Sequence, residues 1–270
     1  MNTLIPLVML TVLSTHVIKA QNCDIHPYIY LKMSDVQAKV PESQKYEIIV
    51  KRQGSDPVNG AKIFADAAKG IYYAKGKDSL KWENVTTSKI KSIHHDFSEG
   101  TPLPVLNHFT YKSMSAPFMN EDFYKNIPQD QVDWAMMLLT DAFMMHEYKL
   151  LILDSLEFNR PYLPRDMSGN DIVMSGLDFN FASEYLQFLW DSFTIYNDKL
   201  CAVVRFESFF NLMGNRQSKG RSMYYGEMFI SLDNKQIEYA RMVEDVVLQQ
   251  KESKEKWMDM QRLVVLNKVK

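Results

Sequence analysis

The sequence predicts an exported α+β protein in which a curved antiparallel β-sheet wraps around a long central apolar helix. Three observations support this: an apolar segment at the start of the chain, strand-like alternation on both sides of the centre, and one helical segment between them. The chain has 46% hydrophobic and 12% aromatic residues, with ten glycines and ten prolines, which is typical of a globular protein with a sizeable core.

Residues 1–20 have the layout of a cleaved secretory signal peptide. The apolar core Leu4–Leu13 is followed by polar residues and then by Ala20, after which we expect cleavage. This core is shorter than the roughly 20 apolar residues that span a bilayer. Because Asn22, rather than Gly, Ala or Ser, directly precedes Cys23, we expect no lipid anchor there. The protein is therefore expected to be secreted or periplasmic.

The charges of the remaining chain are nearly balanced. Residues 21–270 have 30 basic and 33 acidic residues, because the signal segment contains Lys19 and no acidic residue. This balance gives no basic footprint, so we expect no nucleic-acid partner and no anionic membrane partner. The two cysteines, Cys23 and Cys201, either form one disulfide in an oxidising compartment or stay as two buried thiols.

We expect residues 21–270 to form a single domain with three parts. The first part, 21–112, contains N-terminal strands. It alternates in the manner of strands, with a turn-like segment at 54–60. The alanines in the second of its strand segments leave a helix as an alternative. The expected segments are 46–51, 61–67, 70–74 and 89–93.

The central part, 128–156, is expected to be one long apolar helix. Its polar residues recur every seven positions and form one narrow stripe, which we interpret as a solvated face: Asp133, Thr140, Glu147 and Asp154. Most other positions are apolar, so most of its circumference must be covered. Charged residues in mid-segment, Asp141 and Lys149 among them, exclude a transmembrane span. We therefore expect this helix to lie in the concave face of the sheet.

The third part, 196–270, is expected to be an antiparallel meander. Short connections join its strands, including a tight turn at 233–236 and a charged loop at 250–256. The expected strands are 200–210, 223–232, 237–244 and 260–269.

The hairpin of this meander resembles the outer-membrane lipoprotein-carrier superfamily of exported bacterial proteins. The resemblance covers residues 196–245 and rests on the hairpin segments 225–233 and 236–240 and on the preceding strand 196–206. It implies a half-barrel of antiparallel strands, helical segments on its concave face, and an apolar cavity that receives acyl chains. It also favours the bacterial periplasm over a eukaryotic secretory route. The chain departs from a plain carrier in its greater length and its single long helix.

Catalytic and metal-binding patterns are weak in this sequence. His94-His95-Asp96 is interpreted as a solvated strand end, because neighbouring strand residues point to opposite faces. His146 lies away from the polar stripe and is interpreted as a core histidine. No nucleophile motif or phosphate loop is present, so we expect no cofactor and no catalytic residue. A hydrolase with an unrecognised site is the third functional hypothesis.

Two methionine doublets are the main functional lead. They lie with one aromatic residue on the side of the helix that the sheet must cover, and they are the expected ligand-binding residues: Met136, Met137, Phe143, Met144 and Met145. The leading hypothesis is an exported non-enzymatic envelope protein that binds a lipid or lipoprotein acyl chain between sheet and helix. The alternative is a structural module with a fully packed core that docks an envelope protein partner. The sequon Asn84-Val85-Thr86 bears on function only in a eukaryotic setting.

Overall fold

The computed structural model describes most of the chain after residue 30. The described residues are 31–75, 79–97, 99–112, 121–125, 127–147, 152–164, 171–174, 179–214, 219–249 and 257–269. From Lys32 onward the chain forms one compact unit. The expected signal peptide and Cys23 lie outside the described residues. No helix in the described part is long and apolar enough to cross a bilayer.

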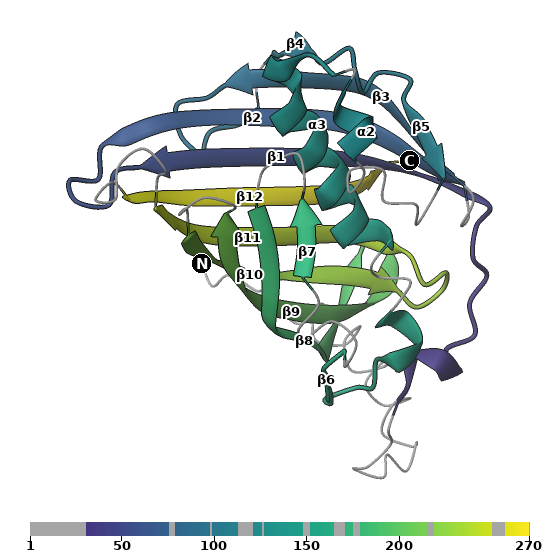
Figure 1. Cartoon of the computed structure of the whole chain (residues 1–270). Helices are drawn as coiled ribbons and strands as arrows, with labels where there is room; N and C mark the ends of the chain where they lie inside the picture. The colour runs from purple at the N-terminus through teal and green to yellow at the C-terminus, as the bar shows by residue number, and fades with distance from the viewer. Residues whose placement is uncertain are drawn as a thin grey trace, which may run out of the picture. The chain divides into compact units, whose positions relative to one another are not determined.

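One open antiparallel sheet dominates this unit (Figure 1). Its twelve strands are β1 (Ser43–Ser55), β2 (Lys62–Lys75), β3 (Ser79–Lys89), β4 (Thr101–Pro102), β5 (Thr110–Lys112), β6 (Pro161–Tyr162), β7 (Asp171–Met174), β8 (Phe179–Tyr196), β9 (Lys199–Gly214), β10 (Lys219–Ser231), β11 (Ile237–Gln249) and β12 (Trp257–Val269). The strand order is β4-β3-β2-β1-β12-β11-β10-β9-β8-β6, while β5 pairs with β3 and β7 with β8. The pairing of β1 with β12 joins the N-terminal and C-terminal parts, which confirms the predicted curved antiparallel sheet.

One helix, α3 (Gln129–Ala142), crosses the concave face of the sheet, as Figure 1 shows. The Arg52 guanidinium of β1 lies 4.4 Å from the ring centre of Trp134, and Arg262 of β12 pairs with Asp141, so the middle and the C-terminal end of α3 contact central strands. Ala135, Leu138 and Leu139 of this helix are fully buried. The other described helical turns are short: η1 (Met33–Asp35), α2 (Glu121–Tyr124), η3 (Phe143–Glu147) and η4 (Leu153–Ser155).

The prediction of one long helix over 128–156 is wrong. The α-helix ends at Ala142, and Phe143–Glu147 continue it as a π-helical turn. The Thr140 hydroxyl donates a hydrogen bond to the Met136 carbonyl at 2.8 Å, an interaction that bends helices and competes with regular bonding. Asp154 lies in the separate turn η4 and is exposed.

Most predicted strands are present, and two of them merge. The segments 61–67 and 70–74 belong to one strand, β2, and the four predicted meander strands correspond to β9, β10, β11 and β12. The prediction of a strand at 89–93 is wrong, because β3 ends at Lys89 and the chain then turns. Two long strands, β3 and β8, are absent from the sequence prediction.

Candidate functional site

A small cavity lies between the π-helical turn η3 and the strands β8–β11. Nine side chains line it: Met144, Met145, Leu186, Phe188, Phe206, Ser208, Tyr224, Met228 and Met242. The cavity volume is about 20 Å³. A space of this size holds about one water molecule, whereas ligand pockets usually measure roughly 300–1,000 Å³. In this conformation, therefore, the cavity is closed to a carbon chain.

The π-helical turn places two of the predicted ligand-binding residues in this lining. Met145 is 1% exposed and Met144 is half-buried. Met136 is also buried, at 4% exposure, and Met137 and Phe143 are half-buried, but none of these three lines the cavity. A π-helical turn inside an α-helix is rare and frequently occurs at functional sites. The structure thus brings the second methionine doublet, but not the first, to one cavity.

A row of polar side chains crosses the inner face of the sheet and ends at the cavity. Directly paired residues of neighbouring strands point to the same face. Following that pairing from β3 to β9, the row is Lys89, Asp66, Arg52, Arg262, Glu244, Tyr224 and Ser208. Neighbouring strands lie about 4.8 Å apart, so the row runs across the sheet beneath α3. Its last two members, Tyr224 and Ser208, line the cavity.

At the centre of this row, one guanidinium serves two buried carboxylates. Arg262 Nη1 lies 2.9 and 3.1 Å from the two oxygens of Asp141, and Arg262 Nε donates to Glu244 at 2.6 Å. The Ser222 hydroxyl donates to Glu244 at 2.6 Å, and Arg262 Nη2 donates to the Tyr224 hydroxyl at 3.3 Å. We call Asp141, Glu244 and Arg262 the buried charge cluster. With all three ionised, the cluster carries one net negative charge.

Burial shifts the pKa of Asp141 and of the groups beside it. Burial raises the pKa of Asp141, the attraction of Arg262 offsets part of that rise, and repulsion from Glu244 adds to it, so that the value is about 7. Burial also raises the pKa of Tyr224 well above its ordinary value, so its hydroxyl stays neutral. The carboxylates beside Arg262 keep its pKa above the ordinary value despite burial. Asp141 therefore titrates around neutral pH.

The other sequence candidates lie apart from the cavity. His146 is 3% exposed and packs against the rings of Tyr46 and Tyr72, at 5.0 and 5.8 Å between ring centres, which places it in the core as expected. His94 and His95 are exposed in a turn. Within the described residues, no group of three or more His, Cys, Asp or Glu is placed to hold a metal ion.

Cys201 is a buried thiol on β9, where it donates a weak hydrogen bond to the Lys199 carbonyl at 3.6 Å. Burial raises its pKa to about 11. Cys23 lies outside the described residues, so the Cys23–Cys201 disulfide stays a prediction. Asn84 of the sequon is exposed and has a φ of 54°.

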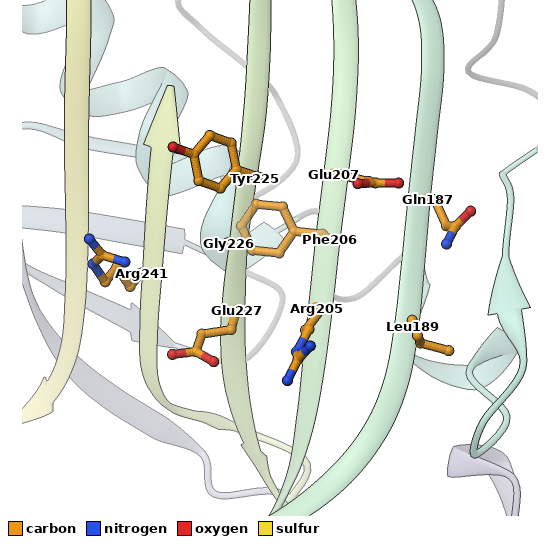
Figure 2. A pocket seen from close by; sticks show the side chains of 9 residues that line it. All are labelled: Gln187, Leu189, Arg205, Phe206, Glu207, Tyr225, Gly226, Glu227 and Arg241. Carbon is orange, nitrogen blue, oxygen red and sulfur yellow. The ribbon is translucent and has the colours of Figure 1, made fainter. Parts of the chain in front are cut away.

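The outer face of the sheet has an open groove of about 420 Å³ across β8–β11 (Figure 2). Figure 2 shows Glu227 between Arg205 and Arg241, in agreement with their pairing across the strands. Arg205 forms an ion pair with Asp191 at 2.9 Å. The Tyr225 hydroxyl donates a hydrogen bond to Asp245 of β11 at 3.1 Å. Such alternation of opposite charges is typical of a solvated antiparallel face.

No family model and no curated protein sequence matches this chain. Among solved structures, the fold is similar to part of lipovitellin, in a structure of its lipid–protein interactions, with 10% identity and a TM-score of 0.45 over 87% of this chain and 26% of that chain. It is also similar to a LolA superfamily protein from Nitrosomonas europaea, with 8% identity and a TM-score of 0.17 over 88% of each chain. At these values neither likeness assigns a family or a function, and membership of the lipoprotein-carrier superfamily stays a prediction.

Proposed function

We propose that this protein binds a single-chain apolar ligand, such as a lipid acyl chain, at the cavity under η3. The observation that carries the proposal is the lining: four methionines and two phenylalanines meet at a π-helical turn. The hydroxyl groups in the lining come from Ser208 of β9 and Tyr224 of β10. Methionine side chains are flexible and polarisable, and they recur at surfaces that adapt to varied apolar ligands. We propose Met144 and Met145 as ligand contacts on the helical side.

Binding requires the cavity to open. Its volume of about 20 Å³ is well below that of a carbon chain, so η3 has to move outward while its two methionines change rotamer. Phe143–Glu147 have π-helical bonding in place of regular α-helical bonding, and such turns frequently occur at functional sites, so we assign the opening to this turn. The rest of α3 stays fixed through Trp134 and Asp141. The ligand therefore replaces the contacts that Met144 and Met145 now make with the sheet.

Native mass spectrometry of the purified protein, followed by lipid extraction, tests the proposal. A stoichiometric amphiphile, or uptake of added dodecan-1-ol at a one-to-one ratio, is the expected result. A clean apo mass in both measurements would overturn the proposal.

A matched pair of variants separates binding from folding. Met144→Gln keeps the side-chain volume but places an amide in the lining, and we expect it to weaken dodecan-1-ol binding at least tenfold. Met260→Gln is the control, because Met260 is also half-buried on the inner face but packs against Phe210, Leu212 and Val246, outside the lining. Equal losses in the two variants would mean that the lining does not contact the ligand.

A second candidate is a protein-interaction module with a packed core. The small cavity favours it, as does an open groove of about 660 Å³ on β9–β12, where Val247 and Trp257 are 43% and 40% exposed. Exposed aromatic side chains beside arginines are enriched in protein interfaces. Under this candidate, Trp257→Ala abolishes capture of an envelope protein partner in cross-linking and leaves the stability of the fold unchanged, whereas Met144→Gln has no effect on capture.

A further inference from the structure

We infer that the polar end of the ligand is uncharged or cationic, and that the site discriminates against carboxylates and other anions. This inference rests on the proposed function and specifies the ligand class of the same cavity. It comes from the position of the cavity beside the buried charge cluster, which contains two carboxylates and one guanidinium.

The hydroxyl side of the cavity determines where the polar end of a ligand lies. Only Ser208 and Tyr224 among the nine lining residues present hydroxyl groups, and both belong to the polar row. A ligand whose chain contacts the methionines therefore places its polar end against these hydroxyls. Tyr224 is directly paired with Glu244 and its hydroxyl accepts a hydrogen bond from Arg262. The polar end of the ligand thus lies within one strand spacing of the cluster.

No unused cation of the row compensates a negative headgroup there. Arg262 is already bonded to both carboxylates of the cluster. Arg52, its neighbour on β1, pairs with Asp66 at 2.7 Å and stacks on Trp134. An anion at Ser208 and Tyr224 would therefore be repelled by the excess carboxylate, at short range and away from water, where such repulsion is strong.

A cation experiences the opposite field. The positive end of a long-chain amine balances the single excess negative charge of the cluster. A neutral hydroxyl exchanges hydrogen bonds with Ser208 and Tyr224 and leaves the cluster unchanged. Desolvation alone penalises an ammonium and a carboxylate alike. Tighter binding of the cation than of the anion would therefore be caused by the negative charge of the cluster and not by desolvation of the headgroup.

The test compares three ligands with the same twelve-carbon chain at pH 8: dodecan-1-ol, dodecylamine and dodecanoate. Binding is measured by displacement of a fluorescent apolar probe below the critical micelle concentration of each ligand. We expect dodecan-1-ol and dodecylamine to bind at least tenfold more tightly than dodecanoate. Dodecanoate binding as tight as dodecylamine overturns this inference but leaves the apolar site standing. If none of the three binds, the proposed function fails, and this inference fails with it.

Glu244→Gln identifies the source of the discrimination. Its amide oxygen can still accept the hydrogen bond of Arg262 Nε, and its NH2 group can donate to the Ser222 hydroxyl, which now donates to Glu244. One negative charge is removed, so the ratio between dodecylamine and dodecanoate should fall at least threefold. Glu238→Gln is the matched control: Glu238 is a buried carboxylate on the same strand, 2% exposed and paired with two lysines, six residues from Glu244. An unchanged ratio in Glu244→Gln, or an equal fall in both variants, overturns the inference. The ranking on the unmodified protein decides the matter if Glu244→Gln does not fold.

Discussion

Replacing Asp141 with Asn tests whether the carboxylate that fixes α3 to the sheet stabilises the fold. Asp141 is fully buried, and its only cationic neighbour in the cluster is shared with Glu244. Burial raises its pKa from 3.8 to about 7, with Arg262 offsetting part of the rise and Glu244 adding to it. A buried ion pair whose desolvation exceeds its attraction weakens a fold, and removing the excess charge then stabilises it.

The size and pH range of the effect follow from these two pKa values. Between pH 3.8 and about pH 7, Asp141 binds its proton more tightly in the native state than in the unfolded chain. The free energy of unfolding therefore decreases as pH rises through this range. The contribution of Asp141 is therefore fully present below pH 3.8 and lost as pH rises through about 7. At about 1.4 kcal/mol per pH unit, the interval corresponds to a loss of about 4 kcal/mol at pH 8. Asn is neutral throughout and does not lose this amount.

Urea unfolding followed by tryptophan fluorescence between pH 4 and pH 8 measures the difference. We expect Asp141→Asn to exceed the parent protein in free energy of unfolding by up to about 4 kcal/mol at pH 8 and by less than about 1 kcal/mol at pH 4. Asp66→Asn is the control with the opposite sign, because Asp66 is bonded by two cations, Arg52 at 2.7 Å and Lys89 at 3.4 Å, and should lose stability at pH 8. If Asp141→Asn is less stable than the parent at pH 8, its ion pair is a net stabiliser and the reasoning is wrong.

Three further predictions concern the sheet. Arg262→Met leaves two buried carboxylates without a cation and should lower the free energy of unfolding in urea by about 3–5 kcal/mol; a loss below 1 kcal/mol would contradict the buried charge cluster. Gly226→Ala should lower the melting temperature in calorimetry more than Gly60→Ala does. The added Cβ at position 226 would lie 2.1 Å from a backbone carbonyl oxygen, whereas at position 60 it would meet open space and only the φ of +70° would be unfavourable. In a Cys23→Ser background, the Cys201 thiol, whose pKa burial raises to about 11, should react with a disulfide reagent at pH 8 only after unfolding; rapid reaction of the native protein would show that it is accessible.

The C-terminal meander was predictable because its alternation is regular and its turns are short. Exposure alternates along most of β10, and the turn between β10 and β11 has Lys235 at a φ of 54°. The strand β8 was missed because two irregularities in its pairing, at Ser183/Tyr185 and Trp190/Ser192, break the period of two. A bulge moves every later side chain to the other face, so one strand resembles several short unrelated segments.

The candidate site was predictable only where it is contiguous in sequence. Met144 and Met145 are neighbours on one helical turn and line the cavity together, while their role as ligand contacts stays a prediction. The buried charge cluster was missed because Asp141 and Arg262 are 121 residues apart, and only the strand register brings Arg262 under the helix. The available signal was Glu244, a charge at an inward position between Met242 and Val246.

The polar row also explains how a sheet of long, similar strands acquires one register. A slip of one residue in β12 would turn Arg262 to the outer face and leave Asp141 and Glu244 without a cation on the inner face. Breaking a buried pair in this way costs roughly 3–5 kcal/mol, which is a large part of the stability of a single domain. The row therefore selects the register and the position of α3 together, even if the net contribution of Asp141 to stability is unfavourable. Since the same row ends at Tyr224 and Ser208, the residues that specify how the helix docks would also determine the charge that the proposed ligand meets in the cavity.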